Sequence, residues 1–174
     1  MYEYLNAGGK VFATHFHYTW FKNSPQDEFR QLAEWGSGSF ATEYDINQTF
    51  PKGEQYALWL KEVGASSTLG KIDLESTTNS IKTIKDPAVA WIQAPNNGAK
   101  YMSFNTPITA PPEEQCGRAV FSDVHMTDKA GPANIGACGL SSGSLNSQQK
   151  AVEFLFFDLS ACVTDDKVAP QPPK

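Results

Sequence analysis

The sequence predicts an α/β domain, and three segments carry that prediction. Residues 11–18 and 117–125 are rich in β-branched and aromatic residues, which is typical of buried strands. Residues 147–162 place apolar side chains at helical spacing over about four turns. A chain of 174 residues that carries both kinds of segment is long enough for one domain with a full core.

Glycines and helix-start signals divide the first part of the chain. Ser24 and Pro25 are typical of a helix N-terminus, and Gly36 and Gly64 end predicted helices. The predicted elements are the last turn of a helix over 1–6, the strand 11–18, a helix over 25–35, an extended segment over 40–50 and a helix over 54–63.

The second part of the chain alternates strands and turns before it ends in a helix. The predicted elements are short strands and loops over 66–86, a strand over 88–93 with a hairpin partner over 101–106, the strand 117–125, a loop over 127–144 and the helix 147–162. That helix is apolar nearly all round, so we expect it to be buried in the core. We expect a single domain over 1–164 and a disordered, proline-rich tail over 165–174.

Charge and hydropathy exclude several kinds of partner. The net charge is −5 and the basic residues form no stripe, so nucleic acid is not an expected partner. No apolar run approaches the roughly 20 residues that a membrane-spanning helix needs. The chain as given has no segment typical of a signal peptide.

The cysteines leave two alternatives open. Cys116, Cys138 and Cys162 include no Cys-x-x-Cys pair, which argues against a zinc knuckle or a redox motif. In an oxidising compartment Cys116 and Cys138 can form a disulfide. The alternative is three reduced thiols.

All three histidines lie in the two main predicted strands. Side chains alternate along a strand, so His15 and His17 share one face, as do Asp123 and His125. Three neutral imidazoles with one open position are the arrangement that a catalytic Zn²⁺ requires. The sequence therefore predicts a metal site made of His15, His17 and His125, with Asp123 as a fourth ligand or as a group that orients a ligand.

The chemistry that follows is hydrolysis of a small molecule. A metal-bound hydroxide attacks an ester, phosphoester or lactone-like centre, Asp123 orients a ligand or accepts a proton, and Tyr18 or Ser122 contacts the developing oxyanion. Zn²⁺ is preferred over other divalent transition metals because it is the common hydrolytic choice. Structural histidines, or a metal-free acid/base role for them, are the alternatives.

A second function class is a non-catalytic binding module for a glycan or a protein at a cell surface. Aromatic side chains can line a cleft for such a ligand, although they are equally typical of a core. The candidates are Tyr18, Trp20, Phe21, Trp35, Trp59 and Trp91. A third reading is a fragment without activity of its own.

Three motifs carry a resemblance to a known family. They are the segment 7–18 with its Gly-Gly-x-Val-Phe-x-x-His pattern, the segment 116–125 with Gly-Arg-x-Val-Phe-x-x-x-His, and the apolar segment 154–160. Together they resemble the C-terminal half of ThuA-like proteins of the class I glutamine-amidotransferase-like superfamily, and a set of uncharacterised bacterial cell-surface proteins. The resemblance implies an extracytoplasmic or surface location.

For the fold, the resemblance implies a truncated flavodoxin-like domain: a mainly parallel sheet flanked by helices, with a β-rich insertion and ligands at the carboxyl ends of the strands. Amidotransferases of that superfamily place a nucleophilic cysteine at a strand-to-helix elbow. Residues 14–17 of this chain are Thr-His-Phe-His, so cysteine chemistry is not implied. Because the front half of the fold is missing, we expect a homodimer that covers the exposed edge.

Overall fold

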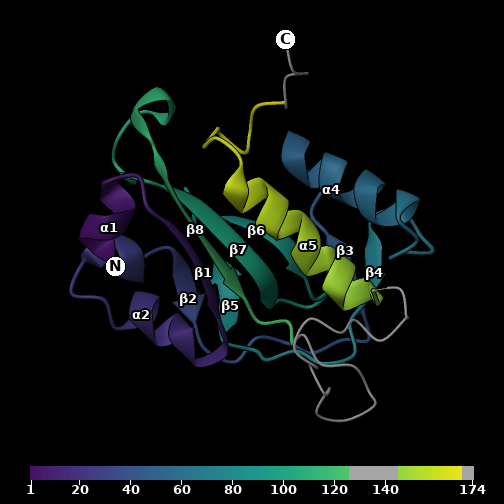
Figure 1. The fold of residues 1–174 in the computed structure, drawn as a ribbon. Helices are drawn as coiled ribbons and strands as arrows, with labels where there is room; N and C mark the ends of the chain where they lie inside the picture. The colour runs from purple at the N-terminus through teal and green to yellow at the C-terminus, as the bar shows by residue number, and fades with distance from the viewer. Residues whose placement is uncertain (126–144, 170–174) are drawn as a thin grey trace, which may run out of the picture.

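A six-stranded sheet forms the centre of the protein in the computed structural model, which describes residues 1–125 and 145–169. Its strand order is β1-β8-β7-β6-β3-β4 (Figure 1). The bounds are β1 Lys10–Thr14, β3 Glu43–Ile46, β4 Lys71–Asp73, β6 Val89–Gln93, β7 Ala99–Thr106 and β8 Gly117–Ser122. Within the described residues, β1 and β8 are the one parallel pair, and the other neighbours are antiparallel.

The α/β class is therefore confirmed, whereas the predicted mainly parallel sheet is wrong. The reason lies in the connections. β6 and β7 form a hairpin through residues 94–98, and such short connections join antiparallel strands only. β8 follows its antiparallel neighbour β7 through residues 107–116, and its parallel pairing with β1 joins strands that are far apart in the sequence. A flavodoxin-like arrangement is not established by this mixed sheet.

Helices cover both faces of the sheet. On one face lie α4 (Pro51–Glu62) and α5 (Ser147–Ser160), which run side by side in Figure 1. The other face carries α1 (Tyr2–Asn6), α2 (Tyr18–Lys22), α3 (Asp27–Arg30) and a small sheet of β2 (Ala33–Trp35) and β5 (Ile81–Ile84). A short 3-10 helix, Pro112–Glu114, precedes β8.

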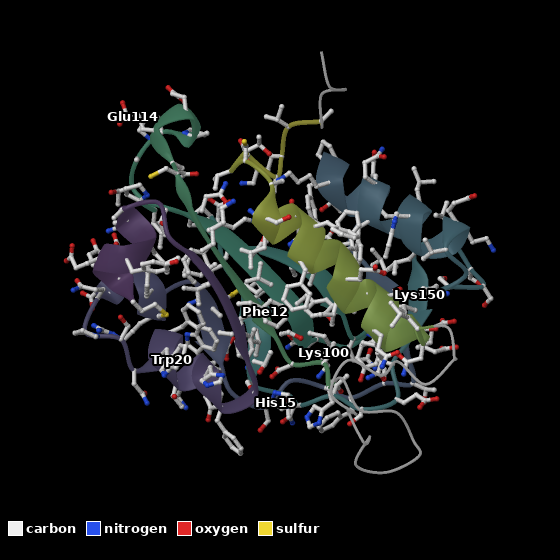
Figure 2. All side chains as sticks on the ribbon, in the orientation of Figure 1. Phe12, His15, Trp20, Lys100, Glu114 and Lys150 are labelled. Carbon is white, nitrogen blue, oxygen red and sulfur yellow. The ribbon has the colours of Figure 1, made fainter. Side chains whose placement is uncertain are left out.

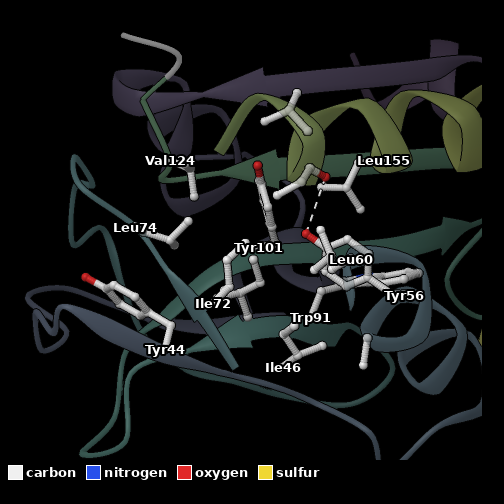
Figure 3. Close-up of a cluster of buried hydrophobic side chains, with 14 of the residues drawn as sticks. Tyr44, Ile46, Tyr56, Leu60, Ile72, Leu74, Trp91, Tyr101, Val124 and Leu155 are labelled. Atoms are coloured by element: carbon white, nitrogen blue, oxygen red, sulfur yellow. Dashed lines mark hydrogen bonds between the residues drawn. The ribbon is translucent and has the colours of Figure 1, made fainter. Parts of the chain in front are cut away.

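Each face of the sheet has its own core. Trp91, Tyr56 and Leu60 are fully buried in the core beneath α4 and α5, where the Tyr56 hydroxyl donates to the Ala151 carbonyl at 3.3 Å (Figure 3). Phe21 and Phe121 lie in the core on the opposite face. β7 and β8 contribute side chains to both cores, because successive side chains of a strand point to opposite faces of the sheet. Their nearly continuous burial is that of strands covered on both sides.

Local sequence signals explain where the two long helices begin. Pro51 occupies the first turn of α4, where its missing N–H costs nothing. Asn146 caps α5: its side chain accepts from the Gln149 N–H at 2.8 Å, and Gln149 Oε1 accepts from the Asn146 N–H at 2.9 Å. This reciprocal capping box starts α5 at Ser147, as predicted.

Two predicted elements near the N-terminus are wrong. The strand expected over 11–18 ends at Thr14, whose register partner Ser122 is the last residue of β8. The chain then turns into the 3-10 helix His15–His17, so His15 and His17 do not share a strand face. The helix expected over 25–35 is reduced to α3, because residues 33–35 pair with β5. Strand pairing outweighs the helical propensity of this segment.

The C-terminal helix is less buried than its composition predicts. Phe156 and Phe157 of α5 are 47% and 59% exposed, because only the side of the helix that faces α4 and the sheet is covered. Beyond the helix, Asp166 is buried although it falls in the predicted tail. Residues 170–174 and the whole of the predicted loop 127–144 lie outside the described residues.

Three further predictions concern a disulfide, a membrane-spanning helix and a homodimer. Cys116 and Cys162 are exposed free thiols, and Cys138 of the expected disulfide lies outside the described residues. Among the helices that the structure describes, none is sufficiently long and apolar to span a bilayer. The predicted homodimer is not tested by a single chain and stays a prediction.

Candidate functional site

The carboxyl ends of β1 and β8 bring two of the three histidines together. His15 directly follows β1, and His125 lies three residues beyond β8. Because the strands are parallel and adjacent, both ends meet at one edge of the sheet. The two imidazole rings are in edge-to-face contact with their centroids 4.1 Å apart. Figure 2 shows His15 at this edge, where β1 ends.

The backbone of His15 has an uncommon conformation. Its φ is +52°, in the left-handed region that few non-glycine residues adopt. This conformation turns the chain from β1 into the 3-10 helix within one residue. Such a conformation costs free energy and persists only where the surrounding structure offsets that cost. Residues in such conformations are concentrated at functional sites.

A pocket of about 350 Å³ opens beside His15. The volume is at the small end of the usual range for small-molecule sites. The lining residues are His15, Phe16, Tyr18, Lys22, Gly36, Ser37, Thr78, Asn79 and Ser80. Lys22 is the one charged side chain in that lining, within the described part of the chain. Tyr18 is thus at the pocket, as its predicted role requires.

Burial lowers the pKa of His15 below its ordinary value, and the neighbouring His125 lowers it further. Asp123 acts in the opposite direction but does not cancel the shift. His15 is therefore neutral at pH 7 and offers a free lone pair. The Nε2 atom of His125 is buried and has no hydrogen-bond partner in the described residues.

An NMR titration tests this electrostatic coupling. We expect the His15 ring protons to titrate with a pKa below about 6.5. In His125→Gln the pKa of His15 should rise, because a neutral amide replaces a second imidazole that can carry charge. An unchanged or lower pKa in this variant would contradict the coupling, and Lys61→Gln, a change on α4, serves as the control.

Asp123 is fully buried and is hydrogen-bonded to the segment that forms one wall of the pocket. Its Oδ1 accepts from the hydroxyls of Thr78 at 2.5 Å and Ser80 at 2.8 Å, and its Oδ2 accepts from the Ser80 N–H at 2.7 Å. Its backbone carbonyl accepts from the Thr78 N–H at 2.7 Å. The carboxylate therefore holds the wall in place and does not line the pocket itself.

The other predicted site residues lie away from the pocket. Ser122 is fully buried, and its hydroxyl oxygen accepts from the Val124 N–H at 3.1 Å. His17 is exposed, and its ring packs on Trp20 with the centroids 4.3 Å apart. Its Nδ1 accepts from the Thr14 N–H at 3.5 Å. Neither residue lines the pocket.

The metal site predicted from His15, His17 and His125 is not assembled in this arrangement. Among residues 1–125 and 145–169, no three His, Cys, Asp or Glu side chains are grouped so as to hold a metal ion. His15 and His125 supply two adjacent imidazoles, and His17 would have to leave Trp20 to become a third ligand. Bound zinc stays a prediction.

Sequence reasoning missed the wall of the pocket and its support. Thr78 and Ser80 sit in a polar segment without periodicity, so no pattern distinguishes them from ordinary loop residues. Gln148 was also missed. Its Nε2 donates to the His125 carbonyl at 2.5 Å and its Oε1 accepts from the Ser76 N–H at 3.0 Å, which joins α5 to the pocket wall and to His125. In the sequence, Gln148 is one of several polar residues in the first turn of α5, and its burial becomes visible only in the structure.

Most of the aromatic residues considered for a binding cleft belong to the cores. Phe21 and Trp91 are fully buried, and Trp35 stacks on Phe21 with the ring planes 6° from parallel. Trp20 is 49% exposed, on the outer side of α2. These six residues therefore do not form one binding surface.

Comparisons with known proteins identify no relative. No protein-family model matches the chain, and neither the curated proteins nor the solved structures include a significant match. The ThuA-like resemblance therefore stays a prediction from three motifs, and the argument for function rests on the site.

Proposed function

We propose that the chain is a small hydrolase whose reactive centre is the His15–His125 pair. The observation that carries the proposal is the contact of two imidazoles, 4.1 Å between centroids, beside a pocket of small-molecule size. The lowered pKa of His15 leaves it neutral near pH 7, as a general base must be. The substrate class is an ester, phosphoester or lactone.

In the proposed reaction, His15 removes a proton from a water molecule as the water oxygen attacks the carbonyl carbon. The Tyr18 phenol or the Lys22 ammonium, both in the pocket lining, donates to the oxyanion that develops. The bond to the leaving alkoxide then breaks, and the alkoxide takes a proton from the imidazolium. The His125 ring packs edge-to-face on His15 and holds that imidazole in place. The same steps apply to a phosphoester.

A divalent metal ion, with Zn²⁺ first, is the second proposal for the same centre. It is favoured by the buried Nε2 of His125, which has no hydrogen-bond partner among residues 1–125 and 145–169, beside a neutral His15, since zinc binds neutral imidazoles. Zinc–nitrogen bonds of roughly 2.0–2.1 Å place the ring centres of two tetrahedral histidine ligands about 5 Å apart. The observed ring contact is closer than that, so metal binding requires the two rings to separate.

Metal analysis with activity assays decides between the two proposals. Purified protein is assayed on p-nitrophenyl acetate, p-nitrophenyl phosphate and δ-valerolactone before and after dialysis against EDTA. We expect hydrolysis to survive dialysis without stoichiometric metal, because neutral imidazole already supplies the base. Loss of activity on dialysis that added Zn²⁺ restores would instead establish the metal-bound form. Absence of hydrolysis with and without Zn²⁺ would refute the hydrolase.

A further inference from the structure

The pocket wall formed by Thr78, Asn79 and Ser80, named the acceptor wall below, has few hydrogen-bond donors left. The hydroxyl protons of Thr78 and Ser80 both go to Asp123 Oδ1, at 2.5 and 2.8 Å. An ionised carboxylate has no proton to return. The oxygens of these two hydroxyls can therefore only accept a hydrogen bond from a pocket ligand.

The third member of the acceptor wall also offers an acceptor. Asn79 donates one Nδ2 hydrogen to the Gly38 carbonyl at 3.3 Å, so its Oδ1 can still accept from a ligand and its second Nδ2 hydrogen can still be donated. Two backbone groups of the wall are also occupied: the Lys100 ammonium donates to the Thr78 carbonyl at 2.7 Å, and the Ser80 N–H is bonded to Asp123. Figure 2 shows Lys100 near the edge of the sheet that carries His15. Three side chains thus present acceptors to the pocket.

The positive charge of the pocket lining favours hydroxyl groups over ammonium groups as the hydrogen-bond donors of a ligand. A ligand that fills it must bring hydrogen-bond donors, either hydroxyl groups or ammonium groups. Lys22 is the charged side chain of the lining, and its like charge disfavours an ammonium ligand. Hydroxyl groups carry no such penalty. The side chains of Phe16 and Tyr18 add ring faces against which the C–H groups of a carbohydrate can pack.

We propose that the acceptor wall selects polyhydroxylated ligands, so that the substrate of the His15–His125 centre is a sugar-sized hydroxylated ester or lactone. The assignment of a substrate rests on the proposed hydrolase function, whereas the binding of a polyol does not. A pocket of about 350 Å³ holds one such ring.

Two lactones with the same reacting ring test the selectivity. D-Glucono-δ-lactone carries hydroxyl groups that δ-valerolactone lacks. We expect kcat/KM for the hydroxylated lactone to be higher by about tenfold or more, since two or three hydrogen bonds are gained. Equal rates would overturn the inference and leave the hydrolase intact.

Paired variants locate the effect on the acceptor wall. Thr78→Val and Ser80→Ala each remove one acceptor, and each should bring the ratio of the two rates closer to one. Thr77→Val is the matched control, because the Thr77 hydroxyl bonds to the Tyr44 hydroxyl at 3.1 Å and does not line the pocket. A ratio that is unchanged in Thr78→Val and Ser80→Ala would overturn the inference.

Asp123→Asn tests the polarity itself. The amide can donate to the Thr78 or Ser80 oxygen, which frees a hydroxyl proton to point into the pocket. The preference for the hydroxylated lactone should then fall although the wall keeps its size. A retained preference in folded Asp123→Asn would argue against the acceptor wall.

A binding measurement keeps this inference separate from catalysis. Saturation-transfer NMR compares 1,5-anhydroglucitol with tetrahydropyran, which is the same ring without hydroxyl groups. We expect the polyol alone to bind, with binding weakened in Thr78→Val and kept in Thr77→Val. If the polyol binds in this way but neither lactone is hydrolysed, the hydrolase fails and the polyol site stands. If the polyol does not bind, the polyol site is refuted.

Discussion

Replacement of His15 by glutamine is expected to lower kcat/KM for the hydrolysed substrate by about 10²- to 10⁴-fold, the usual loss when a general base is removed. Glutamine keeps a polar side chain of similar reach but has no lone pair that can accept a proton at neutral pH. His125→Gln should also lower kcat/KM, because the His125 ring packs on that of His15 and orients it. Initial rates on δ-valerolactone measure both effects.

His17→Gln is the matched control for these variants. His17 is exposed against Trp20 and does not line the pocket, so its replacement should change kcat/KM by less than about threefold, as is usual for a surface substitution. A loss in His17→Gln as large as that in His15→Gln would instead favour a site that uses all three imidazoles. A folded His15→Gln protein with unaltered activity would refute the proposed base.

Arg118→Met is expected to destabilise the folded protein by about 3–5 kcal/mol, the usual cost of removing one partner from a buried ion pair. The Arg118 guanidinium is 1% exposed and lies 2.6 Å from Asp158 Oδ2 and 3.0 Å from Asp166 Oδ1. Lys52 completes a charge-balanced group, at 3.2 Å from Asp158 and 2.8 Å from Asp166. Methionine has a similar length but leaves two carboxylates with one ammonium.

Urea unfolding measures the free energy of unfolding of Arg118→Met and of Glu34→Gln, which serves as the control. Glu34 pairs with Lys82 on the surface, where both side chains are about half exposed, so loss of that pair should cost less than about 1 kcal/mol. A cost below about 1 kcal/mol for Arg118→Met would show that the buried group contributes little to stability.

The pH dependence of stability should change in the same variant. Burial raises the pKa of Asp166, but Arg118 and Lys52 outweigh burial and hold it below its ordinary value. A carboxyl with a lowered pKa in the folded state contributes stability above its unfolded pKa, near 3.9, and that stability is lost as the pH falls through the folded pKa. In Arg118→Met the pKa of Asp166 is lowered less, so Asp166 contributes less to the free energy of unfolding at neutral pH.

Segments with a strong local pattern were predicted well. The strand 88–93 and its hairpin partner follow from apolar runs separated by a cluster of turn residues, and β6 and β7 lie where expected. The start of α5 follows from its capping residues. Segments without such a pattern were predicted poorly: residues 33–35 look helical in isolation but pair with β5, a contact between residues about 48 positions apart.

The candidate site was predicted in part for the same reason. Histidines at the ends of two strands are visible in the sequence, and parallel pairing of those strands brings His15 and His125 into contact. His17 was grouped with His15 on the assumption that the strand continued, but the chain leaves the sheet after Thr14, where β8 offers no further partner. Thr78, Ser80 and Gln148 could not be predicted, because each acts through a residue more than twenty positions away.

By itself the sequence determined the α/β class, the two strands that histidines follow, the hairpin and the capped C-terminal helix, since periodicity, turn residues and caps act over a few neighbouring residues. The tertiary structure alone decided that the sheet is mixed, that His15 meets His125 without His17, and that Asp123 supports the pocket wall. Those outcomes depend on strand order and on where each strand loses its partner, which are properties of contacts between distant segments.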